Sequence, residues 1–470
     1  MTIQEDAILG GGAPSRREGS LPYDLFSQAF LADPFPTLRR MRSEHPVYWH
    51  PVLNAWVLTR YDDVLTITRD RRFSSERAGQ HANGAPPHMV EKLDACNHFW
   101  SLLLPFRDPP RHTVLRALIA KALTPKLMES LRPFVLTVVD EVLDKACPSG
   151  KMDVVQDLAN ILPAVVIAKM LGVPSRDIGR FKSWTNDLFA LLNAPVATEE
   201  AITTCHRGMT GLLGYFHDII EERRRELATE GRRRDLGDDL LSHLIVAEEQ
   251  GERLTEEELV ATSAMIMIGG HETTTHLIGN AVLALLRNPA ELERVRTRPE
   301  LMPGAVEELL RYDGPAMALV RRALEDVEVG GQSIKAGQHL FGMLSAGNHD
   351  PAHFRDPDRL DVTRRDVRNL GLGHGIHYCM GAMLARIEVQ VVLRRILERL
   401  PGLRLASDSL EWIPSVALHG LISLPVTFQA RREDRDAAPA SLRDVDLPAS
   451  VRLPPSIPPS SRRFTLPHRN

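Results

Sequence analysis

Cysteine is scarce in this 470-residue chain, and its four copies are scattered at Cys96, Cys147, Cys205 and Cys379. No two of them have the Cys-x-x-Cys spacing, so the sequence excludes a disulfide-stapled scaffold and most cysteine-rich zinc modules. An excess of positive charge is also missing, because the formal net charge is −4. That balance argues against a nucleic-acid-binding protein, which normally presents a basic face.

Long apolar runs are missing as well. A membrane-spanning helix needs about 20 predominantly apolar residues, and the best candidate, residues 161–173, is shorter and contains Lys169. The first 20 residues are polar and Gly-rich, without the apolar core of a signal peptide. We therefore expect no membrane span and a cytoplasmic location.

What the sequence does contain is helical periodicity, with apolar residues recurring every three or four positions over much of its length. This pattern predicts helices over residues 112–146, 155–171, 203–227, 236–249, 256–287 and 382–400. Alternating β-branched and aromatic residues predict a hairpin over 47–61 and short strands over 318–345 and 403–428. The fold class that we expect is mainly α with small β-sheets.

The domain organisation follows from the distribution of linker residues. No strong linker divides the middle of the chain, so we expect a single domain over residues 21–430. Residues 1–20 are expected to form a flexible N-terminal arm. Residues 431–470 are rich in proline and arginine and poor in large apolar groups, which predicts a disordered tail.

One cysteine differs from the others in its surroundings. Cys379 lies in the stretch GLGHGIHYCMG, residues 371–381, just before the helix predicted over 382–400. The thiolate is the metal-binding form of cysteine, and a helix N-terminus lowers the pKa of a thiol. The glycines would let the backbone curl around the sulfur and approach a flat ligand such as haem. A zinc site made by His374, His377 and Cys379, or a plain Gly-rich turn, are the alternatives.

Four motifs in order give a specific resemblance. The segment from Leu372 to Gly381 resembles the haem-binding signature of the cytochrome P-450 family, Phe-Gly-x-Gly-x-His-x-Cys-x-Gly, with leucine in place of phenylalanine. The stretches DPPRHTVLR (108–116), IGGHETTT (268–275) and ELLR (308–311) resemble three further motifs of that family. The resemblance covers about residues 20–430. It implies an α-rich fold enclosing haem b, with Cys379 as the axial thiolate and metal ligand.

The resemblance also implies roles for other side chains. It assigns the binding of the haem propionates to four of them: His112, Arg116, Arg321 and His377. Taken alone, each would pass for an ordinary surface cation, and the neighbouring Arg322 could replace Arg321. In the third motif, ELLR, the resemblance implies that a buried Glu308–Arg311 pair and Arg359 hold the proximal side in shape.

The segment 268–275 lies inside the predicted helix 256–287. Gly269 and Gly270 are consecutive and invite a kink, and Thr273 can donate to a preceding carbonyl. A surface glutamate is the ordinary reading of Glu272 in isolation. The resemblance implies instead that Glu272 and Thr273 are the catalytic acid–alcohol pair that delivers protons during oxygen activation.

The function implied is that of a monooxygenase. It would insert one atom of O₂ into an apolar small molecule, such as a terpenoid, steroid, fatty acid or polyketide. No reductase domain is recognisable, so a ferredoxin and a ferredoxin reductase would supply electrons from NAD(P)H, docking near three cations: Arg386, Arg394 and Arg395. The expected pocket residues are Phe99, Trp100, Leu188, Leu192, Met317, Leu319, Val416 and Leu418.

Alternatives remain at this stage. A peroxide-driven haem peroxygenase is one, although the Glu272–Thr273 pair argues against it. A zinc hydrolase and a non-catalytic haem sensor are the others. His419 stands where relatives often have arginine, and the sequence gives no account of it.

Overall fold

The computed structural model describes residues 21–77, 85–193, 197–228, 239–249, 254–365 and 367–430. The arm expected over residues 1–20 and the tail expected over 431–470 lie outside these ranges. The same is true of the first residues of the helix predicted over 236–249.

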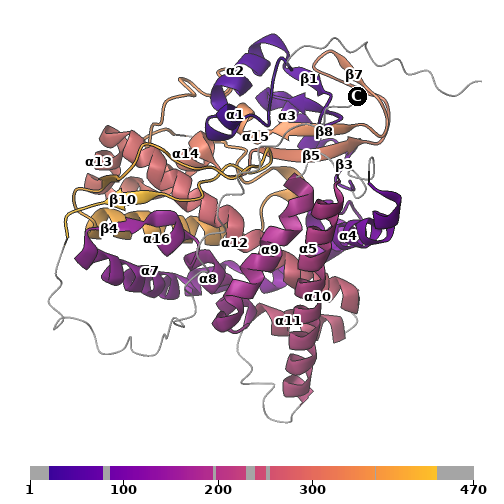
Figure 1. Ribbon diagram of the computed structural model, residues 1–470, viewed down its shortest axis with the longest axis horizontal. Helices are drawn as coiled ribbons and strands as arrows, with labels where there is room; N and C mark the ends of the chain where they lie inside the picture. The colour runs from indigo at the N-terminus through magenta and orange to yellow at the C-terminus, as the bar shows by residue number, and fades with distance from the viewer. Residues whose placement is uncertain are drawn as a thin grey trace, which may run out of the picture.

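A helix of 32 residues, α12 (Glu256–Arg287), runs through the middle of the molecule (Figure 1). It begins at a capping box in which Thr255 and Glu258 satisfy each other's backbone N–H groups, and three glutamates occupy its first turn. Most of its 32 residues are buried, because it packs against α8 (Leu162–Leu171), α14 (Met302–Asp313) and α16 (Ala382–Arg399).

Other helices, of 5 to 30 residues, surround α12. They are α1 (Gln28–Ala32), α2 (Phe35–Glu44), α3 (Tyr61–Arg69), α4 (Val90–Leu102), α5 (Arg111–Ala122), α6 (Pro125–Ser130), α7 (Arg132–Ala146), α9 (Ile178–Asn193), α10 (Glu199–Ala228), α11 (Leu240–Glu249), α13 (Pro289–Thr297) and α15 (Leu344–Asn348). The α-rich architecture predicted from the sequence is confirmed.

The largest sheet lies to one side of the helical body (Figure 1). Its strand order is β1 (Val47–His50), β2 (Ala55–Leu58), β8 (His339–Met343), β5 (Ala318–Ala323) and β3 (Phe73–Ser74). The predicted hairpin is present as β1 and β2. Two small sheets pair β4 (Lys151–Asp153), β10 (Pro425–Thr427) and β9 (Arg404–Leu405), and β6 (Val327–Val329) with β7 (Gln332–Ile334).

Proline positions explain where the helix predictions were too long. The predicted helix 112–146 is divided into α5, α6 and α7, and α6 and α7 each have a proline in their first turn. A proline fits the first turn of a helix but not its interior, so each one starts a new helix. The predicted helix 155–171 is divided into a π-helical turn, Val154–Ala159, and α8.

The segment Val154–Leu171 is long and apolar enough to cross a membrane, by length and composition alone. The sequence prediction, which placed the best apolar run at 161–173, set its limits too narrowly. Most of the segment, 72%, is buried inside the protein. Its apolar character is therefore explained by the core that it forms with α12.

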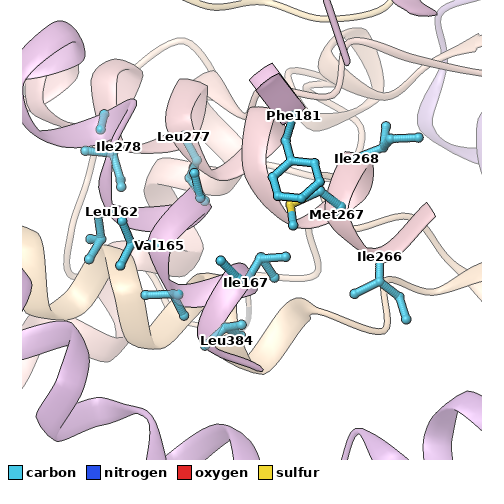
Figure 2. Close-up of a cluster of buried hydrophobic side chains, with 14 of the residues drawn as sticks. Leu162, Val165, Ile167, Phe181, Ile266, Met267, Ile268, Leu277, Ile278 and Leu384 are labelled. Atoms are coloured by element: carbon cyan, nitrogen blue, oxygen red, sulfur yellow. The ribbon is translucent and has the colours of Figure 1, made fainter. Parts of the chain in front are cut away.

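The two consecutive glycines of α12 do not interrupt the helix. A Cβ on Gly270 would overlap the side chain of Ile167, so this glycine lets α8 pack closely against α12. Ile167 belongs to the same buried cluster as Leu277 and Leu384 (Figure 2). The predicted back-bond is confirmed, since Thr273 Oγ1 donates to the carbonyl of Gly269 at 3.0 Å.

The ELLR motif forms a fully buried ion pair. Arg311 Nε and Nη2 donate to the two carboxylate oxygens of Glu308 at 2.7 and 2.8 Å, and neither side chain is exposed to solvent. Arg311 also donates to the carbonyls of Asn348, Pro357 and Arg359. The pair thus fixes a long irregular segment against α14.

The third cation of this cluster was predicted wrongly. Arg359 contributes its backbone carbonyl, while its side chain is exposed. The side chain that reaches Glu308 is that of Arg364, whose Nε lies 3.1 Å from Oε2. The chain turns between the two arginines, and the carbonyls of Arg355 and Asp356 hold the Arg364 guanidinium in place.

This geometry separates the two arginines experimentally. Arg364→Ala removes a charge-assisted hydrogen bond to a buried carboxylate, and we expect the free energy of unfolding to fall by about 1–3 kcal/mol. Arg359→Ala is the control, and it should change that free energy by less than about 0.5 kcal/mol. Urea unfolding followed by circular dichroism measures both. Equal losses in the two variants would contradict the assignment of Arg364.

A second prediction concerns the packing of α9 on α10. A Cβ on Gly208 would meet the backbone of Trp184 and Leu188, which cannot move aside as a flexible side chain could. Gly208→Ala should therefore lower the free energy of unfolding by about 1–3 kcal/mol. Gly214, on the same helix, has open space at its Cβ, so Gly214→Ala should raise stability by up to about 1 kcal/mol. A neutral Gly208→Ala would refute the close approach.

Candidate active site

A cavity of ≈ 910 Å³ lies between α12, the Cys379 loop and the five-stranded sheet. Its walls come from segments far apart in the sequence. The α12 wall consists of Met265, Ile266, Gly269, Gly270, Thr273, Thr274 and Leu277. The opposite wall is the loop from Gly371 to Gly381 with the start of α16. Cys379 and Thr273 therefore line the same cavity, as the motifs predict.

The Cys379 loop is a tight turn that ends at the N-terminus of α16. Gly373 and Gly375 have φ angles of 73° and 68°, which favour glycine, and a Cβ on Gly375 would press against the carbonyl of Thr68. The Cys379 amide donates to the carbonyl of Leu372 at 2.9 Å. The backbone amides of Gly381 and Ala382 donate to the sulfur. Gly381 and Ala382 stand at the start of α16.

The helix N-terminus acts on Cys379 in the expected direction, since the amides of Gly381 and Ala382 lower the pKa of the thiol. Burial raises the pKa of Cys379, and this outweighs the lowering by the two amides and by Arg386 and Arg116. The Cys379 side chain is accessible at the cavity wall. A bound metal cation would be needed to favour the thiolate fully.

The zinc alternative finds no support in the loop. His374 Nε2 lies 2.6 Å from the guanidinium of Arg69, and His377 Nε2 lies 2.9 Å from Ser75 Oγ. In the part of the chain that the structure describes, no three His, Cys, Asp or Glu side chains are placed to hold a metal ion. Both histidines therefore have other partners.

Four predicted propionate-binding residues come from three separate segments. The rings of His112 and His377 lie 4.3 Å apart, and Arg321 is buried and lines the cavity. Arg116 also lines the cavity, and its Nη2 donates to the carbonyl of Tyr378 at 2.8 Å. Arg322 points elsewhere and donates to the carbonyl of Glu76. Of the two adjacent arginines, Arg321 is therefore the one at the cavity.

A fifth cation was missed. Arg77 lines the cavity, stacks on Phe106 and donates to the carbonyls of Ser75 and Pro105. Nothing in its local sequence distinguishes it from the other arginines of the chain. Its position depends on the turn after β3, which places it near Arg321.

Burial disfavours the charged forms of these side chains, and Asp108 opposes this effect at Arg321. Burial lowers the pKa of Arg77 to about 9 and that of Arg321 to about 10. Burial, with Arg321 next, lowers the pKa of His377 to about 3. Both ring nitrogens of His112 are buried without a hydrogen-bond partner among the described residues. A flat group with two carboxylates would relieve both problems, so these residues fit the haem that the resemblance implies.

Glu272 and Thr273 lie on different sides of α12. Thr273 faces the cavity. The Glu272 side chain is 19% exposed, and its Oε1 lies 3.8 Å from His276 Nε2. Its Oε2 is buried and has no hydrogen-bond partner within the described ranges. The two residues are neighbours, but the carboxylate does not point at the hydroxyl.

The predicted pocket residues are partly right. Leu192, Leu319 and Val416 line the cavity. Four others are buried in the hydrophobic clusters of the protein, where neighbouring side chains cover them: Phe99, Trp100, Leu188 and Met317. Leu418 is half-buried and lies outside the set of residues lining the cavity.

The expected docking cations are largely paired with acids. Arg386 lies 2.5 Å from Glu307, and Arg395 lies 2.6 Å from Asp140. Arg394 pairs with Glu398 at 2.9 Å. The net positive charge of this surface is therefore smaller than the three arginines alone would suggest.

Comparison with known proteins agrees with the geometry. The family model described as Cytochrome P-450 matches residues 93–403. The chain is 38% identical to the cytochrome P-450 monooxygenase PikC of Streptomyces venezuelae over 86% of this chain and 94% of PikC. It is 36% identical to the vitamin D(3) 25-hydroxylase of Pseudonocardia autotrophica over 88% of this chain and 98% of that enzyme.

The fold also matches a solved structure. The crystal structure of P450BioI in complex with an acyl carrier protein carrying hexadec-9Z-enoic acid superposes with a TM-score of 0.77 at 34% identity, covering 85% of this chain and 100% of that chain. The match extends over nearly the full length of each relative. With the cysteine loop facing α12 across one cavity, the chain belongs to the cytochrome P-450 family of monooxygenases.

Proposed function

We propose that this protein is a haem-thiolate monooxygenase that inserts one atom of O₂ into an apolar small molecule. The observation that carries the proposal is that Cys379 and Thr273 line one largely apolar cavity of ≈ 910 Å³. A thiolate on one wall and a hydroxyl-bearing helix on the other suit chemistry in which oxygen is activated between them.

The cofactor proposed is haem b. Cys379 would be its ligand, and the propionates would accept hydrogen bonds from five side chains: Arg77, His112, Arg116, Arg321 and His377. When bound, such a haem supplies the activation of dioxygen, because a thiolate ligand favours cleavage of the O–O bond. The amides of Gly381 and Ala382 would tune the sulfur by donating to it.

The proposed catalytic pair is Glu272 and Thr273. Thr273 holds a hydroxyl at the cavity wall, anchored by its bond to the Gly269 carbonyl. Glu272 is the neighbouring acid, and its unpartnered Oε2 is free to bind a proton. Rotation of the Glu272 side chain toward Thr273 would bring that proton to the hydroxyl.

The substrate class proposed is a terpenoid, steroid, fatty acid or polyketide-like molecule. The walls above Cys379 are formed by apolar side chains such as Ile266, Leu192 and Val416. One relative is named vitamin D(3) 25-hydroxylase, and P450BioI was crystallised with an acyl carrier protein that carries hexadec-9Z-enoic acid. Both names indicate large apolar molecules. Electrons are proposed to come from a separate ferredoxin and ferredoxin reductase.

Replacing the thiolate tests the cofactor assignment. Cys379→Ser should abolish the strongly red-shifted band of the reduced carbon monoxide difference spectrum, because that band requires a thiolate ligand. Cys147→Ser, at a buried cysteine of the core, should keep it. A spectrum that is unchanged in Cys379→Ser would refute ligation by this residue.

Replacing the hydroxyl tests the proton pair. Thr273→Ala should lower product formed per NADPH by roughly 10- to 100-fold, with the balance released as hydrogen peroxide. Turnover driven by added hydrogen peroxide should persist, because the peroxide brings its own protons. Thr275→Ala is the matched control, since its hydroxyl donates to the Ala159 carbonyl away from the cavity. Full coupling in Thr273→Ala would contradict the role.

A further inference from the structure

A second group of buried titratable side chains lies beside the cavity wall rather than in it. It comprises Glu272 and His276 of α12, Asp313 at the end of α14, and His419 in the C-terminal loop. His276 and His419 are 6% and 5% exposed. Thr273 and Leu277, which adjoin Glu272 and His276 in the sequence, line the cavity.

His276 occupies the centre of this group. Its Nε2 lies 3.8 Å from Glu272 Oε1. Neither ring nitrogen has a hydrogen-bond partner among the residues that the structure describes. Burying an imidazole without hydrogen-bond partners lowers the stability of the fold, so stability alone does not explain this histidine.

The backbone makes room for this ring. A Cβ on Gly420 would overlap the His276 ring at Nδ1, so the C-terminal loop can approach α12 here only with glycine at position 420. The residue before it is His419, close enough for His276 to lower its pKa. The two histidines are therefore adjacent across the contact between helix and loop.

His419 connects this pair to an acid. Its Nε2 lies 3.6 Å from Asp313 Oδ1, and its ring stacks on Trp412 with centroids 4.1 Å apart and planes within 9°. Asn280 Nδ2 donates to the carbonyls of both Asp313 and His419, at 3.2 and 3.0 Å. The orientation of His419 relative to Asp313 is thus fixed from two sides.

Charged groups lie near both ends of this row of four side chains. At the end formed by Asp313, burial raises the pKa of the carboxyl group to about 7. Arg287 lowers this pKa and Asp33 raises it. The Asp313 side chain is 13% exposed, while its Oδ1, which faces His419, is buried. For His419, burial, then His276 and Arg287, lower the pKa to about 3.

At the inner end, two further bases face Glu272 and His276. Lys182 of α9 lies near the Glu272 carboxylate, and burial lowers the pKa of this lysine to about 8. Burial, then Lys182, lower the pKa of His271 to about 3. His271 and His276, on either side of Glu272 in the sequence of α12, are both buried.

We propose that Asp313, His419 and His276 form a proton relay that recharges Glu272 from solvent. The proposal rests on the proposed role of Glu272 as the acid beside Thr273. His276 and His419 act through Glu272, so they are positioning and relay residues rather than catalytic ones.

The proton balance of the relay is simple. The Asp313 O–H bond breaks as a proton passes to His419, and His419 releases a proton toward His276. His276 then gives one proton to the Glu272 carboxylate, forming an O–H bond. A neutral imidazole accepts on one ring nitrogen and donates from the other, so no stable imidazolium is required. The gap of 3.6 Å between Asp313 and His419 and the gap of 3.8 Å between His276 and Glu272 need one bridging water or a small rotation each. The step between His419 and His276, across the contact at Gly420, would also pass through a water.

The variants that test the relay are His276→Asn, His419→Asn and Asp313→Asn, with Glu272→Gln as reference. His50→Asn is the matched control, because His50 is fully buried with an unpartnered Nε2 among the described residues but lies on β1. The haem-loaded full chain is assayed with plant ferredoxin, ferredoxin reductase, NADPH and testosterone as probe. NADPH consumption is followed in H₂O and D₂O between about pH 5 and 8.

We expect each relay variant to slow NADPH-driven turnover about 10-fold with a larger solvent isotope effect. Wild-type turnover should fall as pH rises through about 7, where Asp313 loses its proton, and Asp313→Asn should remove that step. Peroxide-driven turnover should be unchanged. If Glu272→Gln slows turnover while the relay variants match His50→Asn, the relay is refuted and the proposed function stands. If Glu272→Gln has no effect, the acid role itself fails.

A readout without turnover completes the test. The infrared carbonyl band of a protonated carboxyl should titrate near neutral pH, vanish in Asp313→Asn and shift in His419→Asn. If the histidines serve only to hold a buried water, the band in His419→Asn will remain at its wild-type position, and the relay is overturned.

Discussion

The buried ion pair between Glu308 and Arg311 is the interaction on which the thiolate side of the cavity depends. Arg311 donates to the carbonyl of Asn348, and Asn348 Oδ1 accepts the amide of Leu370 at 2.7 Å, immediately before the Cys379 loop. A buried ion pair returns little net stability, because desolvating both charges offsets their attraction. Its value here is positional: it fixes the segment that presents the sulfur.

Two arginines that line the cavity, Arg77 and Arg321, differ from Arg311 in that neither is held in a buried ion pair of this kind among the described residues. Arg77 and Arg321 are desolvated next to each other, and burial lowers the pKa of each. Asp108 opposes this effect at Arg321. Because a ligand that binds the folded state alone stabilises it by mass action, a dianionic cofactor at these cations would couple its own binding to the stability of the fold. The Glu308–Arg311 pair thus fixes the backbone beside Cys379, while Arg77 and Arg321 remain able to bind an anionic ligand.

Sequence reasoning succeeded where a residue's role depends on its local neighbours. The bounds of α12, the Cys379 loop and the α16 helix after it follow from periodicity and glycine placement within a short window. It failed where the role depends on how distant segments meet. Arg359 and Arg364 have the same local signal, and only the turn between them decides which reaches Glu308. Arg77 is at the cavity because of the path taken after β3, and Phe99 is in the core because α10 covers α4.

The geometry of α12 explains why acid and alcohol are adjacent in sequence yet separate in space. Residues four apart share a face, so Gly269, Thr273 and Leu277 form one stripe on the cavity wall. Glu272, His276 and Asn280 form a second stripe. At 3.6 residues per turn, consecutive residues differ by about 100° around the axis. A carboxylate that meets His276 therefore cannot also meet Thr273, and a proton held at Glu272 reaches the cavity only when that side chain rotates. Supply of protons and their use are thus separated by one side-chain rotation.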